Sequence, residues 1–223
     1  MTSTYMNNNN RSANSTYNLF IIFRISKLIA VIVETKITKI TAFSINSIIY
    51  STLFFFITNQ YGEFNQLAYH NLETAEVTII SKEISWNVDG FTISDSGNKA
   101  AFVVNENGYS SLYLLDTNSF NFKKVTSLPI GLVGGMQFSK DDMSLGLTLN
   151  TYQSPSDTYV LDLEFETLNY KKLTRWTYSE VGGLDTSKFV KPKLIQYESF
   201  DSRKIPAFIY AKKSVSPQPV IIY

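Results

Sequence analysis

The 223-residue chain contains no cysteine and only one histidine, His70. The absence of cysteine excludes a disulfide scaffold, a thiolate nucleophile and a zinc site built on thiolates. A single histidine leaves little scope for a metal site built on imidazoles. An excess of one charge is also lacking, because 20 Lys and Arg residues face 19 Asp and Glu residues. The net charge of +1 therefore indicates neither nucleic acid nor an anionic membrane as a partner.

Aromatic residues are abundant, with 16 Phe and 14 Tyr, and β-branched residues are frequent. Both classes favour β structure. Hydrophobic residues make up 44% of the chain and charged residues 17%, which is enough apolar material for a packed core. The length fits one large domain or two small ones.

The first 52 residues form an atypical segment. Residues 1–18 are rich in Asn, Ser and Thr, which predicts disorder. Residues 19–45 are apolar but interrupted by charges, and they lack the layout of a secretory signal. Residues 40–62 carry no charge, so a membrane span is one interpretation, but scattered polar residues favour strands or misread sequence. Without cysteine or a clear signal, we expect a cytoplasmic protein that does not contact a membrane.

An internal repeat runs through the middle of the chain. Residues 93–126 resemble residues 138–174, with matched positions 45 to 48 residues apart. The clearest match is between "FKKVT" (122–126) and "YKKLT" (170–174). Upstream, Asn71, Val77 and Ser81 stand 45 residues before Asp116, Phe122 and Thr126. The chain therefore contains two complete units and one partial unit.

Each unit has the composition of four short strands. In the first unit, a strand leads into a polar turn at 95–98, and further strands are expected at 100–104, 111–115 and near 122–126. The second unit has its turn at 140–142 and strands expected at 145–149, 158–161 and near 170–174. Four antiparallel strands in this period are typical of a propeller blade. A β-sandwich does not repeat its sequence, and a β-solenoid has a shorter period.

The unit cores "ISDSGNKAAFV" and "FSKDDMSLGLT" are similar to an element of many propeller repeats. The more specific segment is "KPKLIQYESFDSRKIPAFIYAKKSVSPQPVIIY" (191–223), which resembles the propeller–hydrolase junction of the prolyl oligopeptidase family of serine peptidases. Ser202 stands where that family usually has Gly. The resemblance covers residues 56–223. Its matching positions are Ile195, Tyr197, Ser199, Asp201, Ile205, Pro206, Ala207, Tyr210 and residues 219–223.

The resemblance implies an all-β chain: a partial β-propeller of about three four-stranded blades over 53–188, followed by the first two strands of an α/β-hydrolase domain over 189–223. The run "PVIIY" (219–223) is expected to be a strand buried on both faces. In the family, a His-Gly-Gly-Pro loop, a Gly-x-Ser-x-Gly-Gly nucleophile elbow, an Asp and a His follow; none is present here. This implies a truncated, inactive fragment of a peptidase that cleaves short peptides behind a gating propeller. The alternative is a non-enzymatic β-propeller binding or scaffold module.

No catalytic, metal-binding or cofactor-binding residue is predicted, and peptides are expected as substrates only of a full-length relative. His70 matches the penultimate position of a third strand, so it is interpreted as structural. The nearest string to a nucleophile elbow is "GYSSL" (108–112), which lacks the second Gly and is interpreted as a blade loop. Asp141 and Asp142 lack the ligand spacing of a metal loop and are interpreted as a solvated turn.

The remaining conspicuous residues also have structural interpretations. The pairs Lys123–Lys124 and Lys171–Lys172 recur at one blade position, which predicts a strand edge protected by charge. Trp86 and Trp176 are expected in the core. The glycine pairs at 134–135 and 182–183 are expected in tight turns between blades.

Overall fold

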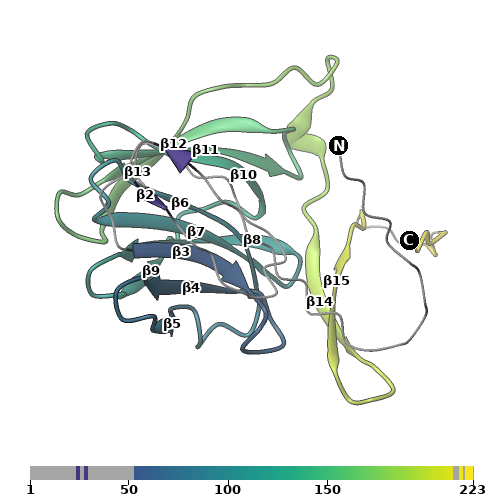
Figure 1. The fold of residues 1–223 in the computed structure, drawn as a ribbon. Coiled ribbons are helices and arrows are strands. Elements are labelled where there is room, and N and C mark those ends of the chain that lie inside the picture. Colours follow the sequence, from purple (N-terminus) through teal and green to yellow (C-terminus); the bar gives the residue numbers. More distant parts are fainter. Residues whose placement is uncertain (1–23, 26–27, 30–52, 213–215, 218, 223) are drawn as a thin grey trace, which may run out of the picture.

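The computed structural model describes residues 24–25, 28–29, 53–212, 216–217 and 219–222 (Figure 1). The disorder expected for residues 1–18 lies outside the described residues, and so does the first part of the uncharged stretch 40–62, whose described part begins at residue 53 with a strand. A short pair of strands, β1 (Arg24–Ile25) and β2 (Leu28–Ile29), precedes the main fold. No helix in the described part has the length and apolar character needed to cross a membrane.

Three antiparallel sheets follow one another along the chain, and the figure shows them stacked face to face (Figure 1). Blade 1 has three described strands: β3 (Leu53–Thr58), β4 (Gln66–Asn71) and β5 (Val77–Ile79). Blade 2 has four: β6 (Asn87–Ile93), β7 (Lys99–Glu106), β8 (Tyr109–Asp116) and β9 (Phe122–Lys124). Blade 3 has four: β10 (Gly131–Phe138), β11 (Ser144–Thr151), β12 (Asp157–Leu163) and β13 (Tyr170–Arg175).

The predicted strands and their repeat are confirmed. All four strands of blades 2 and 3 lie where the repeat placed them, in simple sequential order. The partial unit also obeys the repeat, because β4 ends at Asn71 as β8 ends at Asp116, and β5 begins at Val77 as β9 begins at Phe122. We label the strands of each blade A to D, so that β3, β4 and β5 are strands B, C and D of blade 1.

Blade 2 is buried on both faces, because its apolar side chains pack against blade 1 on one side and against blade 3 on the other. Even-numbered residues of β7, such as Phe102, pack with blade 1, whereas odd-numbered ones, such as Val103, pack with blade 3. This alternation is the period of two that a strand imposes on its side chains. Full burial of a side chain such as Phe102 contributes about 1.5–3 kcal/mol relative to exposure.

Blade 3 alternates differently, because its strands are apolar on one face only. Leu145, Leu147 and Leu149 of β11 face blade 2 and are buried, and the residues between them are not. In β12 the same inward face carries Tyr159 and Leu161. Strand D is an edge strand in each blade, since β9 pairs only with β8 and β13 only with β12 among the described strands. The predicted charged edges at the lysine pairs are thereby confirmed.

After blade 3 the chain crosses a 3-10 turn, η1 (Thr186–Lys188), and forms a separate hairpin of β14 (Lys193–Glu198) and β15 (Lys204–Ile209). Figure 1 shows this hairpin running beside the ends of the blade strands rather than stacking as a further blade. Ser202 in its turn has a φ of +64°, a left-handed conformation that favours glycine. The structure thus gives the reason why Gly is usual at this position.

The expectations for residues 219–223, for Trp176 and for the pair Gly134–Gly135 are wrong. Residues 219–222 form no strand, and Val220, Ile221 and Ile222 are at least 80% exposed, because no described strand lies where it could supply ladder hydrogen bonds. Trp176 is 68% exposed, although Trp86 packs on the core as expected. The pair Gly134–Gly135 lies inside β10 at a shift in register, not in a turn. A Cβ on Gly134 would stand 2.3 Å from the Thr148 hydroxyl oxygen, so close packing of the strands explains this glycine.

Candidate functional site

One end of the stacked blades lies against the hairpin, and we call it the B–C end. It carries the B–C turns of the three blades, at residues 59–65, 107–108 and 152–156. The connections between blades arrive at the same end, because strand D runs towards it and strand A runs away from it. This placement follows from the antiparallel order of each blade.

Three contacts join the hairpin to the B–C end. The Arg203 guanidinium lies 3.6 Å from the Glu63 carboxylate of blade 1. The Gln196 side chain donates a hydrogen bond of 3.3 Å to the Asn107 side chain of blade 2. Gly108, beside Asn107, lies under the Phe208 ring, which would be 3.1 Å from a Cβ at that position. The hairpin therefore spans two blades at this end.

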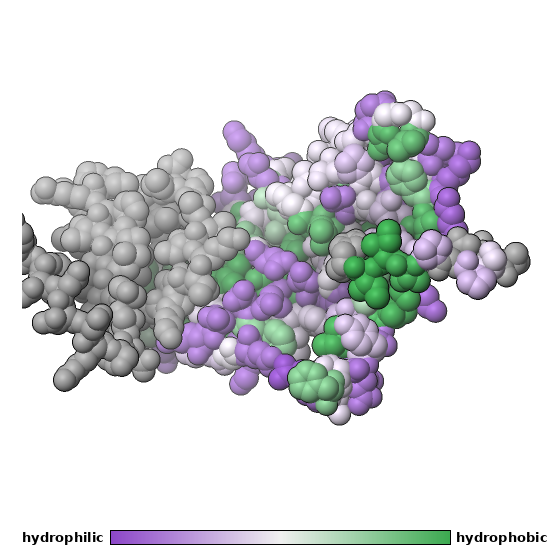
Figure 2. Space-filling model, turned by 90° about the vertical axis from the view of Figure 1, so that its right-hand side faces the viewer, coloured by the Kyte–Doolittle hydropathy of each residue, from purple (hydrophilic) through white to green (hydrophobic). Residues whose placement is uncertain are grey.

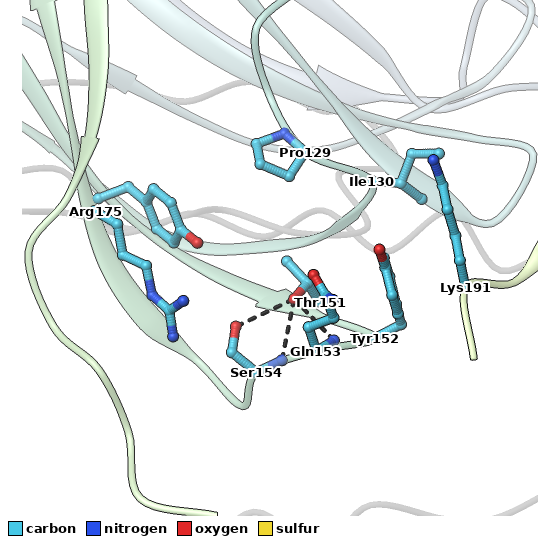
Figure 3. Close-up of a pocket in the computed structure, with 9 residues that line it drawn as sticks. Pro129, Ile130, Thr151, Tyr152, Gln153, Ser154, Arg175 and Lys191 are labelled. Atoms are coloured by element: carbon cyan, nitrogen blue, oxygen red, sulfur yellow. Dashed lines mark hydrogen bonds between the residues drawn. The ribbon is translucent and has the colours of Figure 1, made fainter. Parts of the chain in front are cut away.

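A pocket of about 240 Å³ lies at the same end, between blade 3 and the segment that leads to the hairpin (Figure 3). Its walls come from four parts of the chain: the connection between blades 2 and 3, the B–C turn of blade 3, strands β12 and β13, and the linker before β14. These contribute Pro129 and Ile130, turn residues 152–154 together with Thr151 at the end of β11, Tyr159 and Arg175, and Lys191, respectively.

Behind the pocket wall lies a buried carboxylate, Asp157, at the first position of β12. It accepts a hydrogen bond of 2.5 Å from the Arg175 guanidinium, 3.1 Å from the Thr177 hydroxyl and 2.8 Å from the Ser179 backbone N–H. Burial opposes ionisation of Asp157, but these hydrogen bonds outweigh it and lower its pKa to about 2. The carboxylate thereby ties the linker residues 177–179 to blade 3.

A second network of ionisable side chains lies on blade 2. Glu106 accepts hydrogen bonds from the Tyr113 hydroxyl at 2.5 Å and the Ser111 hydroxyl at 2.8 Å, and it forms an ion pair with Lys124. Burial opposes ionisation of Glu106, but the bonds from Lys124, Tyr113 and Ser111 outweigh it and lower its pKa. Burial, together with Glu106, raises the pKa of Tyr113 above its ordinary value. Each carboxylate oxygen has a donor, which makes this network structural.

His70 and the serines of "GYSSL" lie within strands of blades 1 and 2. His70 is the penultimate residue of β4, as predicted, and it faces Phe54 and Val77 in the neighbouring strands. Ser110 and Ser111 of "GYSSL" lie within β8 rather than in a loop, which corrects the expectation. The Ser110 hydroxyl accepts the Val133 backbone N–H at 3.0 Å, so both serine hydroxyls have structural hydrogen bonds.

The solvated-turn interpretation holds for Asp141 but not for Asp142. Asp141 accepts hydrogen bonds from its own turn, at 2.5 Å from the Ser139 hydroxyl and 3.1 Å from the Met143 N–H. Asp142 is half-buried and instead binds the backbone of blade 2. Within the described residues, no group of three or more His, Asp or Glu side chains could hold a metal ion.

Sequence reasoning missed the pocket and the Asp157–Arg175 pair. A signal was present, because Asp157 continues the inward-facing series Tyr159, Leu161 and Leu163 of β12. An acidic residue on a buried face needs a cationic partner. No sequence pattern indicated that Lys191 and Pro129 line one pocket, because the two residues are far apart in the chain and only the folded structure brings them to the same site.

Comparison with solved structures finds this architecture in prolyl oligopeptidases. Prolyl oligopeptidase B from Galerina marginata, bound to a 35mer hydrolysis and macrocyclization substrate, matches with a TM-score of 0.57 at 17% identity, over 71% of this chain and 22% of that chain. A structure from a study of two prolyl endopeptidases matches with a TM-score of 0.56 at 13% identity, over 71% of this chain and 23% of that chain. The chain has a prolyl oligopeptidase-like fold.

This prolyl oligopeptidase-like fold accounts for the stacked blades, and it is the fold alone that identities of 13% and 17% support. The matched region spans less than a quarter of either solved chain. No protein-family model and no curated sequence matches the chain. The function therefore has to be argued from the hairpin, the B–C end and the pocket.

Proposed function

We propose that the chain is part of a serine peptidase of the prolyl oligopeptidase type. Residues 53–188 are the C-terminal blades of its β-propeller, and residues 189–223 begin its α/β-hydrolase domain. The supporting observation is the hairpin, since the junction motif from Ile195 to Tyr210 folds as β14 and β15 beside the B–C end instead of as a blade.

The two faces of the hairpin differ in a way that supports this proposal. Residues paired across an antiparallel ladder share a face. Gln196 and Phe208 therefore mark the face directed at blade 2. The opposite face carries Lys193 and five apolar residues: Ile195, Tyr197, Ile205, Ala207 and Ile209. An apolar sheet face of this kind suits packing against the rest of a hydrolase domain.

Exposed apolar side chains continue from the hairpin into the residues beyond it. Figure 2 views the molecule from the hairpin side and shows hydrophobic side chains gathered there. The large exposed residues in this part of the chain include Leu194, Phe200, Ile209, Val220, Ile221 and Ile222. Exposed apolar side chains gathered on one surface are typical of a surface that contacts another part of a protein.

In this proposal the chemistry belongs to the hydrolase domain. An acyl-enzyme mechanism needs a serine on a nucleophile elbow, an adjacent base and an oxyanion hole. The serines within β8 of this chain have none of these supports. The propeller instead limits which peptides reach the hydrolase by size, and the 223-residue chain alone has no hydrolase activity.

A fluorophosphonate probe tests the activity part of the proposal. The purified chain should remain unlabelled under conditions in which a full-length prolyl oligopeptidase is labelled. Specific labelling of the chain would overturn this part. Sequencing of the transcript 3′ of the Tyr223 codon tests the family part. A reading frame that encodes a His-Gly-Gly loop and a Gly-x-Ser-x-Gly elbow supports it, and a transcript without them contradicts it.

The second candidate is a non-enzymatic propeller module that binds a ligand. The pocket beside Lys191 is the observation that favours it, because its lining combines apolar, polar and cationic side chains from four parts of the chain. Ligand binding together with a transcript that lacks the hydrolase motifs would favour this candidate over the peptidase.

A further inference from the structure

The pocket between blade 3 and the linker has an uneven charge. Its lining includes two cationic side chains, Arg175 and Lys191, and no carboxylate. Figure 3 places Lys191 beside Ile130 and Tyr152, across the pocket from Arg175. A concave site with positive charge on its walls attracts an anionic ligand.

The two cations are not equivalent. The Arg175 guanidinium is paired with buried Asp157 at 2.5 Å and donates a further bond of 3.1 Å to the Thr177 carbonyl. It also lies 4.5 Å from the centre of the Tyr178 ring. These contacts hold Arg175 in place and neutralise its charge, so Arg175 shapes the wall more than it attracts an anion.

Lys191, in contrast, has no such partner within the described part of the chain. Its ammonium takes part in no ion pair or hydrogen bond with any residue that the structure describes. The other lysine of the linker, Lys188, is paired with Asp185 at 3.3 Å. Lys191 is therefore the cation that remains available to a ligand inside the pocket.

The polar groups of the B–C turn are partly committed to the turn itself. The Thr151 hydroxyl accepts the backbone N–H groups of Gln153 and Ser154, each at 3.2 Å, and lies 3.1 Å from the Ser154 hydroxyl (Figure 3). These bonds make the floor of the pocket rigid. Because the Thr151 and Ser154 hydroxyls are used within the turn, the Lys191 ammonium is the main group in the pocket that favours an anionic ligand.

The side of the pocket next to Lys191 is apolar. Pro129 and Ile130 line it, and Ile130 is 42% exposed. Pockets for drug-sized ligands measure about 300–1,000 Å³. At about 240 Å³, this pocket suits a smaller group, of the size of one amino-acid residue.

We propose that this pocket binds a small carboxylate that bears an apolar substituent. The carboxylate lies on the Lys191 ammonium, and the substituent packs against Pro129 and Ile130. Two sources provide this chemistry: the C-terminal residue of a peptide and a free N-acylated amino acid. The proposal stands independently of the peptidase relationship, because it uses only residues of the pocket.

Calorimetric titration of the full 223-residue chain tests the proposal. The probes are N-acetyl-leucine and N-acetyl-Ala-Ala-Leu, each as the free acid and as the C-terminal amide. We expect the acids to bind about tenfold or more tightly than the amides, because only the acids form a charge-assisted hydrogen bond. Tighter binding of the tripeptide acid identifies the peptide terminus as the ligand, and equal binding identifies the free acid.

Two matched variants complete the test. Lys191→Met removes the ammonium but keeps a long side chain, and it should reduce the acids to the affinity of the amides. Lys188→Met removes the neighbouring, paired lysine and should leave binding unchanged. No saturable binding of the acids, equal binding of acids and amides, or unchanged binding by Lys191→Met would each overturn the proposal. Thermal unfolding of both variants confirms that they are folded.

Discussion

The carboxylate of Asp142 in blade 3 accepts a hydrogen bond of 2.9 Å from the backbone N–H of Asp95 in blade 2. Its second oxygen accepts the N–H of Ser96 at 3.1 Å. One side chain thus satisfies two donors of the neighbouring blade's A–B turn. We call this pair of hydrogen bonds the Asp142 clamp. The repeat places Gly97 at the corresponding position of blade 2, and because glycine has no side chain, blade 2 cannot make the same clamp.

The clamp predicts how substitutions at Asp142 affect stability. Asp142→Ala should lower the free energy of unfolding by about 1–2 kcal/mol, because the hydrogen bonds to Asp95 and Ser96 are lost. Asp142 has a φ of +55°, so Asp142→Gly loses the same bonds but relieves the backbone and should cost less. Urea unfolding measures both. Equal stability of Asp142→Ala and wild type would contradict the clamp.

The hairpin turn at Ser202 predicts a stabilising substitution. Ser202→Gly removes the cost of a left-handed conformation, partly offset by the chain entropy of glycine, for a net gain of about 0.5 kcal/mol. Amide hydrogen exchange in β14 and β15 should slow accordingly. Ser199→Gly, in the same turn without a positive φ, is the control and should accelerate exchange. Slower exchange in both variants would contradict this explanation.

Asp157 predicts an acid-sensitive contribution to stability. Its pKa is about 2 in the folded chain against 3.8 ordinarily, so the folded state favours the ionised form. The resulting stability is present above pH ~4 and is lost as the pH falls towards ~2. Its size is about 2 kcal/mol.

The variant Asp157→Asn isolates this contribution from other carboxylates. It should be less stable than wild type by about 2–3 kcal/mol at neutral pH, because Arg175 loses its charged partner. The difference should shrink as the pH approaches ~2, where Asp157 itself becomes protonated. Urea unfolding at a series of pH values measures this. A difference that does not vary with pH would exclude Asp157 as the titrating group.

The contact between Gly108 and Phe208 predicts coupling between blade 2 and the hairpin. Gly108→Ala places a methyl group 3.1 Å from the Phe208 ring at a φ of +85°, so it should destabilise the turn by about 1–2 kcal/mol. In Phe208→Ala the ring is absent, and the same Gly108→Ala change should cost less there. A double-mutant cycle measured by hydrogen exchange detects the difference. If the stability changes of the two substitutions simply add, the Phe208 ring does not contact Gly108 in solution.

The blades were predictable because each is a local structure with a strong period. The match of "FKKVT" to "YKKLT", and of Asn71 to Asp116, depends on turns and edges that each blade builds alone. Alternation of apolar residues within β11 and β12 then fixes which face is buried. These features need no knowledge of the neighbouring blade.

The features that escaped prediction depend on contacts between distant segments. Asp142 looked like an ordinary turn residue, and its partners lie 46 and 47 residues earlier. The run at 219–222 has strand composition but lies exposed, because composition cannot supply a neighbouring strand. Trp176 is exposed for the same reason, because a tryptophan is buried only where other strands or loops pack against its ring.

By itself, the amino-acid sequence determined the all-β class, the blade period and the odd character of the hairpin segment, because short-range periodicity encodes all three. Only the tertiary structure decided that Lys191 meets Ile130 in a pocket, that Asp157 holds Arg175 behind it, and that the hairpin rests on Asn107 and Gly108. Those juxtapositions arise from how the blades and the linker stack, and no local pattern in the chain specifies them.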